Sequence, residues 1–397
     1  MRNFQVFVPA LSAAILFSAC STGSSTTPIS TTPNVQTRLA HGAVISNVPK
    51  QFLYAANYGS DNISAYSINT TSGALSAVTG SPFTAGTQPT GVAIAPANNF
   101  LYTSNEDSNN VSGYSINVSS GALTQVSGSP FGAGGEPEGI AINKTGKFLY
   151  VANAESGNIS AYAINPSTGS LTQISGSPFG SEVLPVGIGV TPNGKYVYVS
   201  NGGNNGAGSV SAYSINQSSG ALTQVTGSPF SAGYYNDAIA LDTHNKFVYT
   251  TDLTGGVDAF SIGAGGVLTA VSGSPFGAGT DPWAVNVSKN NVFAFVANYS
   301  SDNVSAYTVS PASGALTAVP GSPFNAGTSP RGVLADNRGK FAYVANYGSS
   351  NVSGYKINPT SGALTAVPGS PFGAGTNAFA LATCRVASLT TCKPPKL

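Results

Sequence analysis

The stretch GIAINKTGKFLYVANAESGNISAYAINPSTGSLTQISGSPF, residues 139–179, decides how this chain folds. It opens with a short apolar run at 139–142, and a polar turn separates this run from a second one at 148–151. The segment 159–164 then alternates with a period of two, as a half-buried strand does. A Pro-Ser-Thr-Gly turn leads to a fourth strand at 170–174. The stretch therefore predicts four antiparallel strands, which we name a to d in chain order.

The same unit recurs along the whole chain. Its Ser-Pro-Phe end occurs at 81–83, 129–131, 177–179, 228–230, 274–276, 322–324 and 370–372. Successive copies lie 48, 48, 51, 46, 48 and 48 residues apart. A repeat of this length indicates a stacked or radial architecture. Seven copies of a four-stranded sheet predict an all-β, seven-bladed β-propeller.

The two ends of the repeat predict how the ring closes. The first unit begins at strand b, near Phe52, whereas the last one is followed by an extra strand a at Phe379–Thr383. The segment 375–380 aligns with 279–284, so we expect this C-terminal strand to complete the first blade. The segment Ala43–Val48 is the alternative candidate for the same inner position.

Composition supports a folded β protein and excludes one class of partner. The 397 residues include 15 Lys and Arg against 14 Asp and Glu, and 41% are hydrophobic. Enough apolar side chains are present to build a core. The many Gly, Tyr and Phe residues favour strands over helices. Without a basic excess to neutralise phosphates, nucleic acid is not an expected partner.

The N-terminus has the layout of an export signal. Residues 1–19 contain Arg2, a mostly apolar run and the small pair Ser18-Ala19, which is typical of a secretory signal. The end of this segment resembles a bacterial lipobox, so Cys20 is expected to carry lipid; simple secretion is the alternative. The Ser, Thr and Pro of residues 20–42 predict a flexible tether. We therefore expect a protein of the bacterial cell envelope, in contact with the membrane only through its lipid.

The boundaries of the remaining chain follow from the repeat. The propeller is expected at residues 43–383, and residues 384–397 would form a C-terminal tail. Cys384 and Cys392 lie in this tail. In an exported protein they are expected to form a disulfide, with two free thiols as the alternative.

Several segments resemble a known family. Tyr150-Val151-Ala152-Asn153 and Tyr343-Val344-Ala345-Asn346 are similar to the repeat of YVTN-type propellers. Together with Ser-Gly-Ala-Leu-Thr and Gly-Ser-Pro-Phe, they resemble the lactonase-type seven-bladed family, which includes bacterial 6-phosphogluconolactonase and muconate-lactonising relatives. The resemblance covers about residues 50–383 and implies lactone chemistry as one expected activity. The muconate-lactonising relatives use a His with Arg and Glu, and no His stands in a matching place here.

Within a regular repeat, the positions that depart from the consensus are the informative ones. Strand a should line the central channel, whose mouth is the natural ligand site. The residue just before strand a differs in every unit: Thr90, Glu138, Val186, Asp237, Trp283, Arg331 and Phe379. The position two residues earlier also varies: Gln88, Glu136, Leu184, Tyr235, Asp281, Ser329 and Asn377. Free drift of loop residues is the alternative interpretation.

Roles can be assigned to some of these residues. Trp283, the only Trp, suits stacking on a sugar or an apolar ligand, with a cap over the next blade as the alternative. Glu138 or Asp237 is the candidate general base of a lactone hydrolase, and Arg331 its oxyanion stabiliser. The predicted ligand-binding residues are Trp283, Phe379, Arg331, Glu136, Asp281 and Tyr235.

Most acidic residues fall in the loops of the face where strand a begins: Asp61, Glu106, Asp107, Glu136, Glu138, Glu155, Glu182, Asp237, Asp252, Asp281 and Asp302. A Ca²⁺ ion held by their oxygen atoms is conceivable. Because no Asp-x-Asp-x-Asp loop is present, neither a metal nor another cofactor is predicted.

Two functions remain open from the sequence. The near-identical blades and the incomplete catalytic set favour a monomeric propeller that binds a glycan, peptide or protein at the channel mouth or the acidic-face loops. The alternative is a lactonase-like hydrolase of a sugar lactone or related ester. A phosphorylated lactone fits poorly, because it is anionic and cytosolic while this face is acidic and the chain is expected to be exported.

Overall fold

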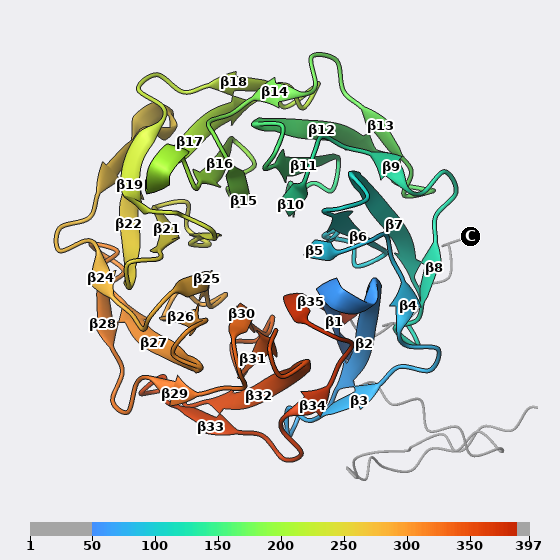
Figure 1. The fold of residues 1–397 in the computed structure, drawn as a ribbon, viewed down its shortest axis with the longest axis vertical. Coiled ribbons are helices and arrows are strands. Elements are labelled where there is room, and N and C mark those ends of the chain that lie inside the picture. Colours follow the sequence, from blue (N-terminus) through green and yellow to red (C-terminus); the bar gives the residue numbers. More distant parts are fainter. Residues whose placement is uncertain (1–49, 387–397) are drawn as a thin grey trace, which may run out of the picture. The chain divides into compact units, whose positions relative to one another are not determined.

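Seven blades arranged in a ring are formed by residues 50–386, the part of the chain that the computed structural model describes (Figure 1). Each blade is an antiparallel sheet of four strands in sequence order from the channel outward. A short fifth strand, which contains the Phe of each Ser-Pro-Phe, pairs with strand c beside strand d. The predicted all-β, seven-bladed propeller with four antiparallel strands per blade is confirmed.

The bounds of the elements follow the repeat. The inner strands a are β5 (Pro89–Ile94), β10 (Pro137–Ile142), β15 (Pro185–Val190), β20 (Ile239–Leu241), β25 (Pro282–Val287), β30 (Pro330–Ala335) and β35 (Ala378–Val386). Strands b are β1 (Lys50–Asn57), β6 (Phe100–Asn105), β11 (Phe148–Asn153), β16 (Tyr196–Asn201), β21 (Phe247–Asp252), β26 (Phe293–Asn298) and β31 (Phe341–Asn346). Strands c are β2 (Asn62–Ile68), β7 (Asn110–Ile116), β12 (Asn158–Ile164), β17 (Ala207–Ile215), β22 (Gly256–Ile262), β27 (Asn303–Val309) and β32 (Asn351–Ile357).

The outer strands are shorter. Strands d are β3 (Leu75–Ala77), β8 (Leu123–Gln125), β13 (Leu171–Gln173), β18 (Leu222–Gln224), β23 (Leu268–Ala270), β28 (Leu316–Ala318) and β33 (Leu364–Ala366). The fifth strands are β4 (Phe83–Thr84), β9 (Phe131–Gly132), β14 (Phe179–Gly180), β19 (Phe230–Tyr234), β24 (Phe276–Gly277), β29 (Phe324–Asn325) and β34 (Phe372–Gly373). Three single turns of 3₁₀ helix are η1 (Tyr58–Ser60), η2 (Asn204–Gly206) and η3 (Ala264–Gly266). Within residues 50–386, no helix is long and apolar enough to cross a bilayer.

The C-terminal strand closes the ring, as expected from the sequence. β35 pairs with β1 in one antiparallel ladder that runs from Lys50 opposite Val386 to Asn57 opposite Ala378. The strand extends beyond the predicted boundary at residue 383, so Cys384 lies inside the sheet opposite Phe52 and is fully buried. Cys392 lies outside the described residues, and its disulfide with Cys384 stays a prediction. The alternative strand 43–48, the signal 1–19 and Cys20 also lie outside them.

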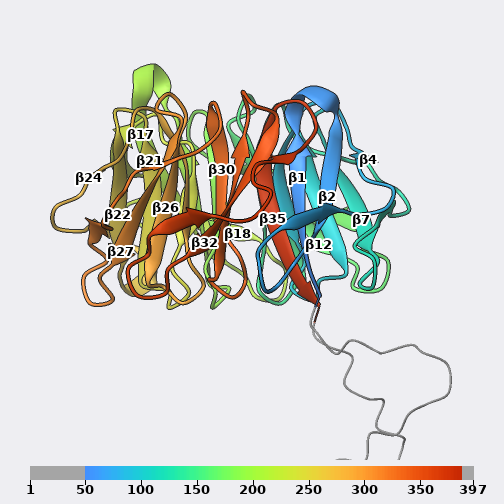
Figure 2. The same ribbon diagram turned by 90° about the horizontal axis from the view of Figure 1, so that it is seen from below.

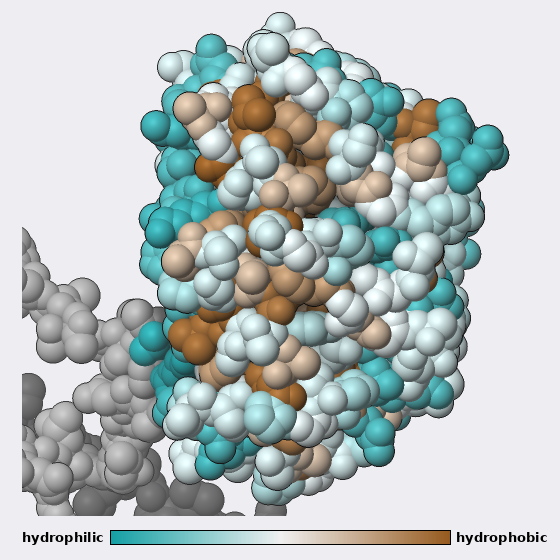
Figure 3. Space-filling model, turned by 90° about the vertical axis from the view of Figure 1, so that its left-hand side faces the viewer, coloured by the Kyte–Doolittle hydropathy of each residue, from teal (hydrophilic) through white to brown (hydrophobic). Residues whose placement is uncertain are grey.

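The core lies between neighbouring blades and repeats with them. A tyrosine in strand b is fully buried in six blades, and Phe295 takes its place in the seventh. The hydroxyl of Tyr150, for example, donates to the carbonyl of Gly220 in the next blade at 2.9 Å. Burial of a large ring with its hydroxyl satisfied therefore joins each blade to its neighbour. On the outer rim, apolar groups alternate with hydrophilic ones (Figure 3).

The asparagine that ends strand b fixes the loops of one face. The Nδ2 of Asn153 donates to Asn158 Oδ1 at 2.7 Å and to Ser160 Oγ at 3.0 Å, and its Oδ1 accepts from the amide of Gly134 at 3.2 Å. Asn153 thus joins strand c to the segment that enters strand a of its own blade. Figure 2 shows the strands running between two faces, with both ends of the described chain at the lower one. We call the opposite face, where the inner strands begin, the upper face.

Candidate functional site

A β-bulge opens six of the seven inner strands. In β25, Pro282 pairs with Asn298 and Ala284 pairs with Ala297, so Trp283 is the extra, unpaired residue. Arg331 in β30 and Phe379 in β35 hold the same place. A bulge re-aims the side chain of its extra residue. The seven variable residues that the repeat singled out are thereby set apart from the regular ladder; Asp237 precedes the shorter β20.

The residue after each bulge is Gly or Ala because the next blade comes very close. A Cβ atom on Gly91 would lie 2.6 Å from the carbonyl oxygen of Glu138, and one on Gly332 would lie 2.5 Å from that of Phe379. The hydroxyl of Thr90 donates to the same carbonyl of Glu138 at 3.2 Å. These small residues bring the six bulged positions and Asp237 together around the channel.

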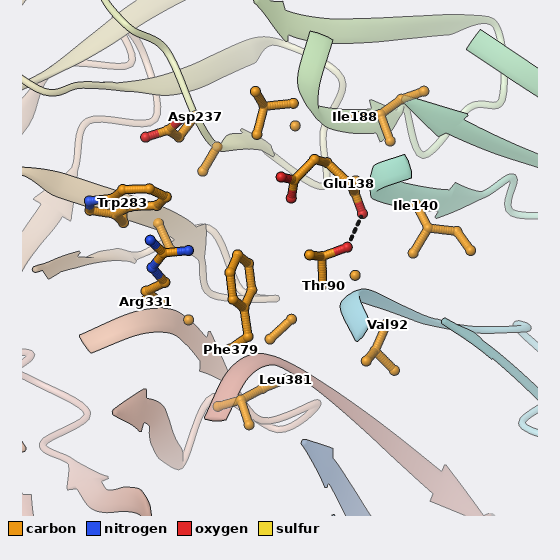
Figure 4. A pocket seen from close by; sticks show the side chains of 18 of the residues that line it. Thr90, Val92, Glu138, Ile140, Ile188, Asp237, Trp283, Arg331, Phe379 and Leu381 are labelled. Atoms are coloured by element: carbon orange, nitrogen blue, oxygen red, sulfur yellow. Dashed lines mark hydrogen bonds between the residues drawn. The ribbon is translucent and has the colours of Figure 1, made fainter. Parts of the chain in front are cut away.

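All seven of these residues line one cavity of about 510 Å³ at the upper mouth of the channel (Figure 4). The structure thus brings Glu138, Asp237, Trp283, Arg331 and Phe379 together. The apolar inner-strand residues below them form the floor: Val92, Ile140, Ile188, Ile239, Val333 and Leu381.

One half of the mouth is aromatic and surrounds Arg331. The Cζ of Arg331 lies 3.7 Å from the ring centroid of Trp283, 4.6 Å from that of Tyr347 and 4.7 Å from that of Phe379. These are cation–π distances. Within residues 50–386 no carboxylate lies within 4.0 Å of Arg331, and its buried Nε has no hydrogen-bond partner. Arg331 and Asp237 therefore form no ion pair, and the guanidinium is free for a ligand.

The other half of the mouth is acidic. The pKa of Glu138 is raised to about 8, mainly by burial and then by the Glu106 carboxylate, while Arg331 opposes the shift. Burial likewise raises the pKa of Asp237 to about 7, again against Arg331. Burial and the charge of Glu136 raise the pKa of Glu106. The buried Oδ2 of Asp237 finds no hydrogen-bond partner within the described residues. Carboxyl groups with pKa values near neutrality in a cavity are typical of acid–base chemistry.

A second ring of residues was missed by the sequence analysis. The residue after strand b also varies between units: Tyr58, Glu106, Ala154, Gly202, Leu253, Tyr299 and Tyr347. Tyr58 and Glu106 line the cavity, and Tyr299 and Tyr347 lie against Arg331. Tyr58 stacks on Phe379 with ring centroids 5.6 Å apart, and Tyr299 lies 5.5 Å from Trp283. Tyr58 also donates to Glu106 Oε1 at 3.4 Å. Glu106 was noted only as one acid among many. The same comparison between units, made one residue after the conserved turn asparagine, would have found this ring.

Three predicted ligand-binding residues do not line the cavity. Glu136 lies in a separate acidic hollow with Gln88, Asp107 and Glu155. Asp281 accepts a hydrogen bond from Ser300 Oγ, and Tyr235 packs edge-on against Tyr234. All seven residues of this set have φ between 46° and 57°, the left-handed region, whereas the bulged residues two places later point into the channel. This backbone conformation explains why the two variable sets separate.

No metal site is found in the described part of the chain. Between residues 50 and 386, no three His, Cys, Asp or Glu side chains are grouped so that they could hold an ion. His244, the one His of this segment, lies in an a–b turn of the lower face, where its Nδ1 is 2.6 Å from Asn291 Nδ2.

The family model of the seven-bladed β-propeller lactonases matches residues 21–133, 131–187, 235–319 and 284–377, which is most of the chain. The chain belongs to the lactonase propeller family. Solved structures share the fold of this lactonase-family propeller. A putative 6-phosphogluconolactonase from Bacteroides fragilis matches with a TM-score of 0.74 and 19% identity, over 87% of this chain and 100% of that one.

A putative 6-phosphogluconolactonase from Bacteroides uniformis matches with a TM-score of 0.72 and 18% identity, over 84% of this chain and 99% of that one. The periplasmic gluconolactonase of Pseudomonas aeruginosa matches with a TM-score of 0.71 and 20% identity, over 86% and 99%. No curated protein matches the chain significantly.

Proposed function

We propose that this lactonase-family propeller hydrolyses an uncharged lactone at the upper mouth of its channel. One observation carries the proposal. Two carboxyl groups with pKa values of about 7 and 8 line the same cavity as a guanidinium that has no carboxylate partner among the described residues. These are the groups that acyl transfer to water requires: a base, an acid and an oxyanion stabiliser.

The pKa values divide the two carboxyl groups between the two proton transfers. Asp237 has the lower pKa of the two and is partly ionised at neutral pH, so it accepts a proton from the attacking water. The water oxygen bonds to the carbonyl carbon, and the electron pair that moves to the carbonyl oxygen is stabilised by Arg331. Glu138, still mostly protonated at neutral pH, then gives its proton to the ring oxygen as the carbon–oxygen bond breaks. The product is a hydroxy acid.

The aromatic half of the mouth orients the substrate. Trp283, Phe379 and Tyr347 surround the guanidinium of Arg331. Glu138 lies across the cavity from Arg331, and Asp237 lies beside Trp283 (Figure 4). A flat lactone ring placed between the two halves has its carbonyl oxygen toward Arg331 and its ring oxygen toward Glu138. The same rings exclude water from one side of the reacting centre.

The charge of the cavity argues for an uncharged substrate. One guanidinium faces three carboxyl groups, those of Glu106, Glu138 and Asp237, so a phosphate group would meet more like charge than opposite charge. The family and the names of its solved members support lactone chemistry. Identities of 18–20% do not carry the relatives' substrates over to this chain.

A panel of neutral and phosphorylated lactones tests the proposal. The wild type should hydrolyse a neutral member, and Arg331→Met, which keeps a side chain of similar length without the charge, should lose about 10²–10³-fold in kcat. Thr328→Ser, on the rim of the same blade, is the matched control and should retain the wild-type rate. Absence of turnover on the whole panel would reject the proposal.

The aromatic half also favours a second candidate, namely binding of a glycan, peptide or protein without turnover. Five aromatic residues, Tyr58, Trp283, Tyr299, Tyr347 and Phe379, line or frame one side of the mouth. Aromatic faces stack on sugar rings and on apolar side chains. Titration of the wild type with oligosaccharides and peptides, followed by Trp283 fluorescence, distinguishes this candidate. A saturable response in a protein that hydrolyses no lactone would favour binding alone.

We also infer the location of the protein from its first residues. The layout of residues 1–19, followed by Cys20 and a Ser/Thr/Pro-rich segment, supports export and lipid anchoring at the cell envelope. Labelling of cells with a fatty-acid analogue should mark the wild type but not Cys20→Ser. Equal labelling of both proteins would reject the anchor.

A further inference from the structure

Two neighbouring blades depart from the repeat at the upper rim. Val183-Leu184 and Tyr234-Tyr235 stand where the other five units have small or polar pairs: Thr87-Gln88, Gly135-Glu136, Thr280-Asp281, Thr328-Ser329 and Thr376-Asn377. Four apolar or aromatic side chains therefore replace mainly Thr and amide or acidic residues, and all four precede the inner strands β15 and β20. Nothing in the repeat itself requires this change, since five blades fold without it.

Two of these four side chains are exposed, and the other two belong to residues with an unfavourable backbone conformation. Val183 is 40% exposed and Tyr234 is 47% exposed, which places both among the large apolar side chains most open to solvent in residues 50–386. Leu184 has φ 54° and Tyr235 has φ 46°, a region that suits Asn and Asp far better than bulky residues. The fold alone would be served better by Asn, as at Asn377. Exposed apolar side chains, each followed by a bulky residue in a strained backbone conformation, indicate a binding role.

The apolar rim adjoins a residue that lines the cavity. Val186 follows Leu184 by two residues and lines the cavity between Glu138 and Asp237. A Cβ atom on Gly202 would lie 3.2 Å from the ring of Tyr235 and 3.4 Å from Cβ of Leu184, so Gly202 forms the floor between these two side chains.

The second ring has its smallest side chains in this sector. The second ring has Ala154 and Gly202 here, where the aromatic half has Tyr58, Tyr299 and Tyr347. The next member of that ring, Leu253, adds another apolar side chain beside Tyr234, whose carbonyl accepts its amide at 2.9 Å. The acidic half of the mouth therefore has small residues next to an apolar rim.

We propose that this sector, which comprises Val183, Leu184, Val186, Tyr234, Tyr235 and Leu253, is a subsite for a hydrophobic alkyl or aryl substituent of the substrate. The assignment rests on the proposed lactone hydrolysis. A lactone whose ring oxygen faces Glu138 directs the substituent of the adjacent carbon over Val186 and out between Leu184 and Tyr235. The substrate class is then an uncharged lactone that carries an apolar chain on the carbon bonded to the ring oxygen.

The test measures how the rate depends on chain length. A series of lactones of one ring size, with unbranched alkyl substituents from methyl to heptyl on that carbon, is assayed with the full-length protein. In the wild type, kcat/KM should rise by about twofold to fourfold per methylene until the chain passes the rim, since a fully buried methylene gives about fourfold and a half-exposed one less. A flat dependence on chain length would overturn the subsite.

A matched variant distinguishes binding at this subsite from non-specific hydrophobic binding of the longer chains. Val183→Thr combined with Leu184→Asn and Tyr234→Thr installs residues that this chain already uses at the same positions in other blades, so folding is preserved. The gain per methylene should fall to nearly none. Val292→Thr removes a valine that is equally exposed, at 40%, on the lower face, and it should retain the wild-type slope. Equal slopes in the three proteins would overturn the subsite.

A parallel binding series separates this inference from the proposed reaction. Cyclic ethers with the same alkyl chains have no carbonyl to attack, and their binding is followed by Trp283 fluorescence. A chain-length slope in binding that the triple variant abolishes, without turnover of any lactone, would reject hydrolysis and retain the subsite. Turnover without any slope would retain hydrolysis and reject the subsite. Self-association of the wild type that the triple variant abolishes, with no slope, would assign the surface to a protein contact instead.

Discussion

The two halves of the channel mouth are made from equivalent positions of one repeat, yet they have opposite chemistry. Over β25, β30 and β35, the bulged residue and the residue after strand b are the pairs Trp283/Tyr299, Arg331/Tyr347 and Phe379/Tyr58. Over β5, β10, β15 and β20, the pairs are Thr90/Glu106, Glu138/Ala154, Val186/Gly202 and Asp237/Leu253. The backbone is nearly the same in both halves, so the contrast comes from side chains alone.

The contrast shows how one positive charge and three acids coexist in one cavity without neutralising one another. The aromatic rings hold the guanidinium of Arg331 by cation–π contact, so it needs no carboxylate partner. Burial holds the pKa values of Glu138 and Asp237 near neutrality, so these groups need not ionise fully. Each half therefore keeps a polar atom without a hydrogen-bond partner among the described residues: Nε of Arg331 in one and Oδ2 of Asp237 in the other.

Removal of β35 should abolish both halves at once and has the largest expected effect. Truncation after Thr376 takes away Phe379 and leaves β1 without its inner partner from Lys50 to Asn57. The ring then has an open edge, and the domain should fail to give a cooperative thermal unfolding transition by circular dichroism. Truncation after Val386 is the control and should retain the transition. A truncated protein with wild-type Tm would show that closure does not depend on this strand.

Asp237→Asn should remove the proposed general base while the shape of the mouth is kept. Loss of the general base is expected to lower kcat by about 10²–10⁴-fold, with Tm at neutral pH unchanged or raised. Asp242→Asn is no suitable control, because Asp242 caps an a–b turn through the amide of Phe247. Asp107→Asn, an exposed acid of the same face, serves instead and should retain activity. A fully active Asp237→Asn protein would remove Asp237 from the mechanism.

Arg331→Ala should weaken the aromatic half by an intermediate amount. In the proposed mechanism the side chain donates to the substrate carbonyl, and the loss of one charged hydrogen bond costs about 1.5–3 kcal/mol in ligand affinity. The rings of Trp283 and Phe379 remain, so apolar ligands should be affected least. Isothermal titration with a lactone and with its cyclic ether measures the difference. Equal losses for both ligands would mean that Arg331 acts only by packing.

Glu138→Gln should change the pH dependence of stability. The folded-state pKa of about 8 lies above the unfolded value, so the folded protein binds the extra proton and stability falls as pH rises from about 4 to 8. Each unit of raised pKa corresponds to about 1.4 kcal/mol at most, less where cavity water screens the charge. The variant should equal the wild type near pH 4 and exceed it at pH 8 in chemical denaturation. Parallel pH profiles would contradict the burial argument.

Trp283→Phe should have the smallest effect. Phe keeps an aromatic face under Arg331 but has a weaker quadrupole, so ligand affinity should fall by about 0.5–1 kcal/mol. Calorimetry must replace fluorescence here, because the only Trp is removed. Trp283→Leu should lose more than Trp283→Phe. An equal loss of affinity in both variants would show that Trp283 contributes only apolar contact and no cation–π interaction.

The repeat allowed the fold, and the ring of residues at the head of the inner strands, to be predicted from the sequence. A regular spacing gives the blades, and comparison between units picks out the bulged residues, because equivalent positions share one height in the ring. Tyr58, Tyr299 and Tyr347 were not recognised because they follow the turn asparagine directly and fall in a segment with the composition of an ordinary loop. The left-handed φ of Leu184 and Tyr235 was not readable either, because such residues rarely adopt it. Both gaps concern local backbone direction, which composition does not encode.

The bulge at the head of each inner strand has a consequence for how such a protein changes over time. Its extra residue takes no part in the regular register of the sheet, so a replacement at Thr90 or Val186 alters what the mouth offers while the ladders of the blade stay as they are. Six such positions, together with Asp237 ahead of β20, can therefore be substituted one at a time while the blades stay unchanged. A library randomised only at these seven codons would explore new chemistry without first having to solve the folding problem again.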